Sequence, residues 1–509
     1  MQAINYKVTQ NAESLLLIGF IIYGLIGKLL ICLNKSLNSD EVIAGMASRE
    51  MLVHKDYLLS QYYFSSSTSN IFSDILPFHL LPQLISNFNP YAIRIMAFVI
   101  FLLVVIIFSY IIFKITDEKI NGLIFAALLS NLWAGSFGFY SMATSHNATL
   151  FFTGIFILLF INKNLTLNLS SILSILLLNL IVFSDTIIIA WFVIPFIAIY
   201  ILFFKGKNYN ANLMVSLIGL TTVITYIIKT YFISNFLSDS IYIVDIKTIL
   251  GTNIPLYIKG LLYLLNESVY SVYDKLAPSD YIIIISLILL LYFGVKQILS
   301  NQTIKIKEFY YLLVASAIIV SLAYVCTNLC IDFNTTRYLT FTAMSIYILI
   351  SMSYNKKSIH IFLILLILLS SGFFNYTTVK DLDYQPNKAQ FELIEYLKEN
   401  GLLYGVGDYW DSNIITYLSK EQVIIRPILL SDGQILPPNW WWSSQRWYSG
   451  EAIDFNKFFL IFRSDDTPMM DALKPYLMNN QPNETKSYKN SNRNSPDNDV
   501  SDGVHENLR

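Results

Sequence analysis

Long apolar segments recur along this chain of 509 residues and constrain its fold more than any other feature. Hydrophobic residues make up 55% of the sequence and charged residues only 14%, with 35 Phe and 34 Tyr. A soluble domain cannot bury that much apolar surface, whereas a bilayer accepts runs of roughly 17–25 apolar residues as spanning helices. The pattern predicts about eleven spans, at 14–33, 91–113, 120–137, 147–162, 169–184, 186–204, 211–233, 280–299, 309–331, 337–354 and 359–375.

Lysine residues cluster in alternate connections between the predicted spans, while the short connections 138–146 and 332–336 contain none. The positive-inside rule then predicts a cytoplasmic N-terminus and, with an odd number of spans, an external C-terminus. The long connections 34–90 and 234–279 are expected to be external. The lysines concerned are Lys114, Lys119, Lys163, Lys205, Lys207, Lys296, Lys305, Lys307, Lys356 and Lys357.

The first external loop is expected to contain helices. Apolar residues follow near-helical spacing over 40–52, and a second apolar stretch covers 71–84. Ser39 is a suitable N-cap, and Asp40 and Glu41 fall in the first turn, where acidic residues favour a helix. We expect both segments to be interfacial helices that lie on the membrane.

The composition changes after residue 375, where a small soluble domain is expected. An amphipathic helix over 388–400 ends at Gly401, and three short apolar runs predict strands, at 402–409, 423–428 and 458–462. From about residue 480 the chain is polar and rich in Asn, which predicts a disordered tail.

Together these features predict an all-α polytopic membrane protein of about eleven transmembrane helices, with interfacial helices in the first external loop and a small external α/β domain near the C-terminus. The expected location is the plasma or inner membrane. The expected domains are a transmembrane domain at 1–375, which includes the loop 34–90, an external domain at 376–479 and the tail at 480–509.

Asp40 and Glu41 are adjacent carboxylates at the expected membrane surface. In one reading, the two acids only stabilise the helix by interacting favourably with its dipole. Alternatively, one of them is a general base that takes a proton from an acceptor hydroxyl or amine. The residues alone favour neither reading.

Two other polar residues lie at the predicted outer ends of spans. Asp185 separates two apolar runs with almost no loop, where it is either a turn residue or a second acid of a site. His146 begins the span at 147–162 and is either an interfacial residue or a hydrogen-bonding partner for a phosphate or an acceptor.

Two basic residues are candidates for binding a phosphate. Arg337, followed by Tyr338, begins the tenth predicted span, and its planar guanidinium suits a phosphate group. The alternative is an interface anchor. Lys229 lies near the outer end of the seventh span and either snorkels to the surface or contacts a lipid phosphate.

Other signals exclude several classes of function. A net charge of −1 leaves no nucleic-acid footprint, and the three cysteines, Cys32, Cys326 and Cys330, have no zinc or disulfide spacing. His54 and His79 are expected at the surface rather than as metal ligands, so no metal site is assigned. The aromatic segments 404–410 and 440–448 predict either a small core or a surface that stacks on sugar rings.

Several short motifs occur in a recognisable order: Ser39-Asp40-Glu41 after the first span, Ala47–Leu52, Asn89–Arg94, Ser184-Asp185, Thr336–Leu339, and an external C-terminal domain. This order resembles the membrane glycosyltransferases of the C superfamily, near the protein-mannosyltransferase and aminoarabinose-transferase branch. The resemblance covers residues 1–375 in layout.

The resemblance implies an inverting hexosyl- or pentosyltransferase with an external active site and a polyprenyl-phosphate-sugar donor. It places the catalytic carboxylate on Asp40, with Glu41 beside it, and a phosphate contact on Arg337. The acceptor would be a lipid, a glycan or a protein. Many relatives carry a further acid where this chain has His146, so no cofactor is assigned and a divalent metal stays open.

Two other readings remain. A flippase or transporter of lipid-linked sugars would need ionisable residues near the middle of the bilayer or paired broken helices. A polysaccharide polymerase or ligase would have its key residues in a large late loop. The polar residues of this sequence lie instead in the first loop and at one face of the membrane.

Overall fold

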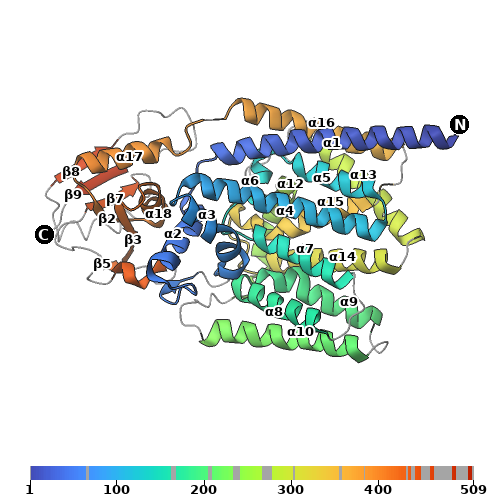
Figure 1. Cartoon of the computed structure of the whole chain (residues 1–509), viewed down its shortest axis with the longest axis horizontal. Coiled ribbons are helices and arrows are strands. Elements are labelled where there is room, and N and C mark those ends of the chain that lie inside the picture. The colour runs from blue at the N-terminus through green and yellow to red at the C-terminus, as the bar shows by residue number, and fades with distance from the viewer. Residues whose placement is uncertain are drawn as a thin grey trace. The chain divides into compact units, whose positions relative to one another are not determined.

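Apolar helices dominate the structure, which is a computed structural model of the whole chain (Figure 1). It forms two compact units. Unit 1 contains Met1–Leu33, Ala97–Lys229 and Asp239–Leu382; unit 2 contains Asn34–Met96, Thr230–Ser238 and Asp383–Arg509. The structure describes residues 2–64, 68–161, 168–204, 209–232, 241–265, 278–301, 304–352, 354, 358–382, 384–431, 434–436, 442–448, 459–463, 484–488 and 502–506.

Unit 1 is a bundle of helices, and each predicted span falls on a helix or on two consecutive helices. α4 begins in unit 2 and continues through unit 1. The helices are α1 (Gln2–Asn34), α4 (Pro90–Thr116), α5 (Lys119–Ser130), α6 (Ala134–Tyr140), α7 (Asn147–Ile161), α8 (Leu169–Ser184), η2 (Ile189–Val193), α9 (Ile194–Phe204), α10 (Tyr209–Ile227), η3 (Ile228–Phe232), α11 (Ile246–Thr248), η4 (Ile249–Asn253), α12 (Ile254–Leu264), α13 (Pro278–Asn301), α14 (Ile304–Cys326), η5 (Phe333–Leu339), α15 (Thr340–Met352) and α16 (Ser358–Lys380).

Among the described residues, five helices are long and apolar enough to cross a membrane, or six if a bent pair counts as one span. The prediction of about eleven spans stays a prediction, because several apolar helices here are shorter than 18 residues. The predicted external loop 234–279 also contains the helices α11, η4 and α12, which the sequence analysis did not anticipate.

The third predicted span, 120–137, is broken. α5 and α6 meet at an angle of 107°. A broken helix leaves its last carbonyl groups without partners inside the helix. The side chains of Asn131 and Asn375 donate to carbonyl groups at this break. Asn131 Nδ2 donates to Ala127 O at 2.8 Å, and Asn375 Nδ2 donates to Asn131 O at 3.1 Å.

Lys28 of α1 completes this arrangement. Its ammonium group is fully buried and donates to Leu132 O and to Asn375 Oδ1. A cation at a helix C-terminus is favoured by the helix dipole. α1 can approach closely because a Cβ on Gly24 would lie only 2.4 Å from Ser130 O. In Figure 1, α1 and α16, which carry Lys28 and Asn375, run side by side.

Unit 2 combines helices of the first loop with the C-terminal α/β part. Its elements are α2 (Ser39–His54), β1 (Tyr62–Tyr63), η1 (Ile71–His79), α3 (Leu80–Ile85), α17 (Lys388–Glu399), β2 (Tyr404–Gly407), α18 (Tyr409–Leu418), β3 (Ile424–Pro427), β4 (Leu429–Ser431), β5 (Gln434–Leu436), β6 (Ser443–Ser444), η6 (Gln445–Tyr448), β7 (Phe459–Arg463), β8 (Glu484–Tyr488) and β9 (Asp502–Glu506).

The main sheet has the strand order β3-β2-β7-β9-β8. β3, β2 and β7 run parallel to one another, β9 runs antiparallel to β7, and β8 runs antiparallel to β9. The predicted helix 388–400 and the strands at 402–409, 423–428 and 458–462 correspond to α17, β2, β3 and β7. Gly401 adopts φ +71° after α17, a left-handed conformation that suits glycine at a helix end.

The structure differs from the sequence-based expectation in three places of unit 2. α2 is buried on more than one face: Val42, Ala44, Met46, Ala47 and Met51 are all buried, and it packs against α18, α3 and η1. Small and apolar residues on more than one face explain this. The position of α2 at the membrane interface stays a prediction. His79 was expected at the surface but is fully buried, 3.2 Å from Asp74. The expected disordered segment 480–509 contains the strands β8 and β9, which pair with each other.

The buried Lys28 makes a stability prediction. Lys28→Leu leaves the carbonyl of Leu132 and the side chain of Asn375 without their donor, at a cost of about 1–3 kcal/mol for each unsatisfied group. We therefore expect a lower thermal unfolding midpoint in detergent. Lys114→Leu, at an exposed position of α4, is the matched control. Equal midpoints for the two variants would contradict this role of Lys28.

Candidate functional site

The first turn of α2 presents the two adjacent carboxylates. Its N-cap is Asn38, one residue before the predicted Ser39, because Asn38 and Glu41 form a capping box. Asn38 Oδ1 accepts from Glu41 N at 3.0 Å, and Glu41 Oε2 accepts from Asn38 N at 3.4 Å. This reciprocal pair needs Glu three residues after the cap, which only Asn38 provides.

Glu41 is occupied by local interactions. Besides the capping bond, its Oε1 accepts from Lys35 Nζ at 2.6 Å, and the residue is only 1% exposed. Both oxygens of Glu41 therefore serve the start of α2.

Asp40 faces the C-terminal part of the same unit. Tyr409 donates its hydroxyl to Asp40 Oδ1 at 2.8 Å, and Ser39 donates to the backbone carbonyl of Trp410. Tyr409 begins α18 directly after β2, where Asp408 caps the helix by accepting from Asp411 N at 2.9 Å. These contacts fix the position of the Asp40 carboxylate.

The glycines of β2 allow this strand to sit between its neighbours. A Cβ on Gly405 would lie 2.5 Å from the ring of Phe459, and a Cβ on Gly407 would lie 2.6 Å from Ile461 Cγ2. The sheet therefore needs glycine at both positions to pack. The strand ends just before Tyr409, whose hydroxyl reaches Asp40.

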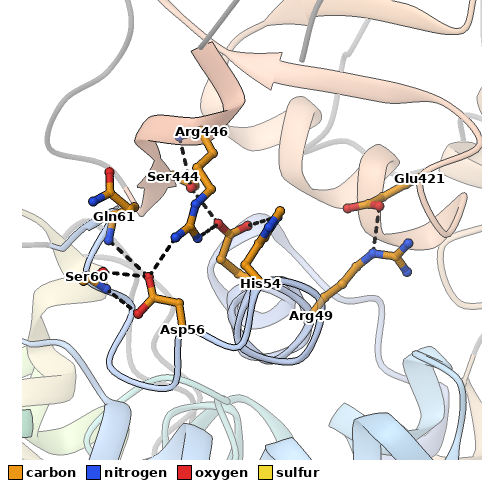
Figure 2. Close-up of polar contacts among 9 residues, drawn as sticks. Arg49, His54, Asp56, Ser60, Gln61, Glu421, Ser444 and Arg446 are labelled. Carbon is orange, nitrogen blue, oxygen red and sulfur yellow. Dashed lines mark hydrogen bonds and ion pairs between the residues drawn. The ribbon is translucent and has the colours of Figure 1, made fainter. Parts of the chain in front are cut away.

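The other end of α2 is held by an ionic network (Figure 2). Glu50 Oε1 accepts from Ser444 Oγ and from Arg446 Nη1, each at 2.8 Å, and Arg446 Nη2 also donates to Asp56 Oδ2 at 3.3 Å. Arg49 forms a separate ion pair with Glu421 at 2.7 Å.

Asp56 is an acceptor for its own loop as well as for Arg446. Partial burial raises the pKa of Asp56, but hydrogen bonds from Ser60 and Gln61 and the charge of Arg446 together hold it below the usual value. The carboxylate therefore stays ionised in this network, and α2 is anchored at both of its ends.

The tryptophan-rich segment packs largely as an aromatic core. Trp447 is buried and lies 5.7 Å from the ring of Tyr62, and the guanidinium of Arg426 stacks on its ring at 4.4 Å. Trp442 contacts Phe64 at 5.7 Å. Trp440 and Trp441 lie outside the described residues.

In unit 1 a buried carboxylate and an imidazole form a second cluster. Asp185 is fully buried directly after α8, and its Oδ2 accepts from His146 Nδ1 at 2.8 Å and from Thr149 Oγ1 at 2.7 Å. Its Oδ1 accepts from Ile187 N at 3.2 Å. Residues 146 and 149 face the same partner because they are three apart at the start of α7.

Aromatic rings connect this pair to the basic residues. The ring of Tyr338 lies 5.1 Å from that of His146, and the Arg337 guanidinium lies 5.8 Å from the same tyrosine ring. Trp191 lies 5.9 Å from His146 and donates to Tyr338 O at 3.4 Å. Lys229 is buried within electrostatic range of Asp185.

The structure thus gathers four predicted residues, His146, Asp185, Lys229 and Arg337, in one cluster of unit 1, from four separate parts of the sequence. Asp40 and Glu41 belong to unit 2. Sequence reasoning missed Thr149 and Tyr409 as partners. The spacing of Thr149 from His146 was a usable signal, whereas nothing in the sequence connects Tyr409 to Asp40.

Within the described residues, no group of three or more His, Cys, Asp or Glu side chains is arranged to hold a metal ion. The chemistry available to the two clusters is that of a positioned carboxylate in unit 2, and of a cationic and hydrogen-bonding cluster in unit 1.

Comparisons by sequence find no matching family model and no similar curated protein. Comparison of structures finds similarity to the oligosaccharyltransferase of Archaeoglobus fulgidus. The structure of AglB from this organism, in complex with an inhibitory peptide and a dolichol-phosphate, matches with a TM-score of 0.50 and 11% identity over 90% of this chain and 71% of that chain.

Two further structures of the A. fulgidus oligosaccharyltransferase match with lower TM-scores. The apo form has a TM-score of 0.48 at 12% identity, over 80% of this chain and 64% of that one. The form tethered to an acceptor peptide with the NVT sequon has a TM-score of 0.43 at 13% identity, over 80% of this chain and 63% of that chain. This chain therefore spans less than two thirds of the length of the protein in these two structures.

The likeness at such low identity is one of fold, and it agrees with the resemblance drawn from the motifs. The chain shares its fold with the structure of AglB from A. fulgidus.

Proposed function

We propose that this protein is a membrane glycosyltransferase that moves a sugar from a polyprenyl-phosphate-linked donor to a lipid, glycan or protein acceptor, with inversion at the sugar carbon. The fold supports the class of enzyme, and the dolichol-phosphate in the AglB complex supports the class of donor. The observation that carries the proposal is the cluster of unit 1, where His146 and Arg337 both pack on Tyr338 and Lys229 lies near Asp185.

A phosphate group suits this cluster on chemical grounds. Guanidinium and ammonium groups are the usual partners of phosphate oxygens, and the planar fork of arginine binds two of them at once. We assign Arg337 as the principal phosphate ligand and the amine of Lys229 as a second ligand. The guanidinium of Arg337 lies 5.8 Å from the ring centroid of Tyr338.

Asp40 is the proposed general base. It accepts the proton of the acceptor as the acceptor attacks the sugar carbon, and its negative charge stabilises a transition state with oxocarbenium character. The hydroxyl of Tyr409 orients the carboxylate. Glu41 supports this turn through Lys35 and the capping box rather than by contacting substrate.

The long apolar helices support an integral membrane protein. We propose that its N-terminus is cytoplasmic and its C-terminus external, in the plasma or inner membrane, because lysine residues are concentrated in alternate connections.

Replacing Asp40 tests the base. Asp40→Asn keeps the size of the side chain and its capacity to accept from Tyr409 but removes the charge, so sugar transfer in membranes should fall by roughly 10²–10⁴ at an unchanged protein level. Glu41→Gln should be milder. Asp56→Asn, at the other end of the helix, controls for general loosening of α2. Near-normal transfer by Asp40→Asn would refute the assignment.

Replacing Arg337 tests the phosphate ligand. Arg337→Lys keeps the charge but loses the bidentate fork, so the apparent KM for the lipid-linked donor should rise modestly. Arg337→Ala should raise it on the order of 10- to 100-fold, because a charge-assisted hydrogen bond contributes about 1.5–3 kcal/mol. The KM for the acceptor should change little. If both variants use the donor as the parent does, Arg337 is an interface anchor and Lys229 becomes the next candidate.

Fusions test the orientation. A phosphatase reporter joined to the C-terminus should be active outside the cell, and a fluorescent protein at the same place that folds only in the cytoplasm should stay dark. The opposite pair of results would reverse the topology and place Asp40 on the cytoplasmic side.

A further inference from the structure

A buried arginine of unit 2 lacks acceptors for its hydrogen bonds. Arg426 of β3 is only 7% exposed, and its Nε and Nη1 atoms have no hydrogen-bond partner among the residues that the structure describes. Arginine keeps its charge in proteins, although burial lowers the pKa of Arg426. A buried donor without an acceptor costs free energy, and a charged donor costs more than a neutral one. The fold therefore gains nothing from these two donor atoms.

A buried hydroxyl group nearby has the same deficit. Tyr62 of β1 is fully buried, and its hydroxyl has no partner in the described part of the chain. Burial raises the pKa of Tyr62 well above its usual value, so the hydroxyl keeps its proton. Trp447 joins the two residues, because its ring lies 5.7 Å from the Tyr62 ring and 4.4 Å from the Arg426 guanidinium. Three donor atoms of one aromatic cluster thus lack acceptors.

Negative charge is already present near Arg426. Its guanidinium lies within electrostatic range of Glu421 and Glu50. Glu421 forms its ion pair with Arg49, and the ion pair of Glu50 is with Arg446. What Arg426 and Tyr62 lack is therefore hydrogen-bond acceptors rather than negative charge. This deficit favours an uncharged ligand that is rich in oxygen atoms over an anion.

An aromatic side chain beside Tyr62 is held in an unusual backbone conformation. Trp442 has φ +38°, in the left-handed region that a bulky residue rarely adopts. Strain of this kind is concentrated at sites that bind ligands. The side chain of Trp442 is half-buried, and its ring lies 6.4 Å from that of Tyr62 and 5.7 Å from that of Phe64. Trp442 thus places a partly accessible indole next to the unfilled donors.

We propose that Arg426, Tyr62 and Trp442 bind an uncharged sugar of a glycan. Arg426 and Tyr62 donate to its hydroxyl oxygens, and the Trp442 indole stacks on the apolar face of its ring. The donor atoms are buried, so the sugar reaches them through a local rearrangement, and the strained Trp442 is the residue placed to make it. This inference goes beyond the proposed function, because binding requires no sugar transfer and is measured by itself.

A glycan array tests the class of ligand. The full chain in phosphatidylcholine nanodiscs is applied to neutral oligosaccharides of glucose, galactose, mannose and N-acetylglucosamine, and to the same sugars carrying carboxylate or phosphate groups. Empty nanodiscs are the blank. We expect binding to neutral oligosaccharides, with no requirement for a charged group.

Variants test the residues, with the dissociation constant for the best neutral oligosaccharide measured by calorimetry. Arg426→Gln should weaken binding about 10-fold or more, and Tyr62→Phe about 2- to 10-fold, because a charged donor contributes more than a neutral one. Trp442→Ala should also weaken binding. Trp410→Ala, at an exposed tryptophan of α18, is the matched control and should bind as the parent does.

Stability separates a role in binding from a structural role. Tyr62→Phe removes a hydroxyl that has no partner, so the thermal unfolding midpoint should not fall. Tyr448→Phe is the matched control in the same cluster, because Tyr448 donates its hydroxyl to Pro427 O at 2.6 Å. Loss of that hydrogen bond should lower the midpoint.

Several results would overturn the inference: no neutral oligosaccharide binds, binding is confined to the charged sugars, or Arg426→Gln and Tyr62→Phe bind as the parent does. A midpoint of Tyr62→Phe as low as that of Tyr448→Phe would also overturn it, since the Tyr62 hydroxyl would then hold a structural partner such as an enclosed water. If neutral glycans bind and the variants lose binding while the parent transfers no sugar, the glycan site stands and the proposed function fails.

Discussion

A carboxylate buried among apolar helices must obtain its hydrogen bonds from the chain itself, and Asp185 shows what this requires. Its partners come from the start of α7 and from the turn that follows α8, so satisfying one charge fixes how these two segments meet. The same constraint explains Lys28, whose ammonium group supplies donors at the break between α5 and α6. Polar residues in this bundle are thus structural necessities first. The cluster around Asp185 also contains His146, Arg337 and Lys229.

The helix that carries Asp40, α2, is held in place by polar contacts at both of its ends. α2 is capped by Asn38 and Glu41 at its start and tied to Arg446 through Glu50 near its end, while Tyr409 holds the carboxylate of Asp40. Two of these partners lie in the C-terminal part of the sequence. The C-terminal α/β part of unit 2 therefore contributes directly to the setting of the proposed base, which gives a physical reason for its presence if the proposed function holds.

Much of the fold was predictable because apolar runs long enough for membrane helices are visible in a sequence, as are short strands such as β3 and the glycine that ends α17. The bend after Ser130 was not predicted, since the run 120–137 is mostly apolar and no proline marks the break, and the polar pair Ser130-Asn131 alone is a weak signal for a helix end. The candidate site was likewise predictable in part. Residue types and positions singled out His146, Asp185 and Arg337, but their assembly depends on helix packing over separations that no local pattern encodes. Tyr409 lies 369 residues from Asp40, so that contact was inaccessible to sequence reasoning.

The central claim is that a lipid phosphate is held by the cluster of unit 1. Its most direct test is a cryo-electron microscopy structure of the full chain in nanodiscs with farnesyl monophosphate. We expect density for the phosphate against the Arg337 guanidinium, near Lys229, with Asp185 still bonded to Nδ1 of His146. Phosphate density that contacts neither Arg337 nor Lys229 would contradict the claim.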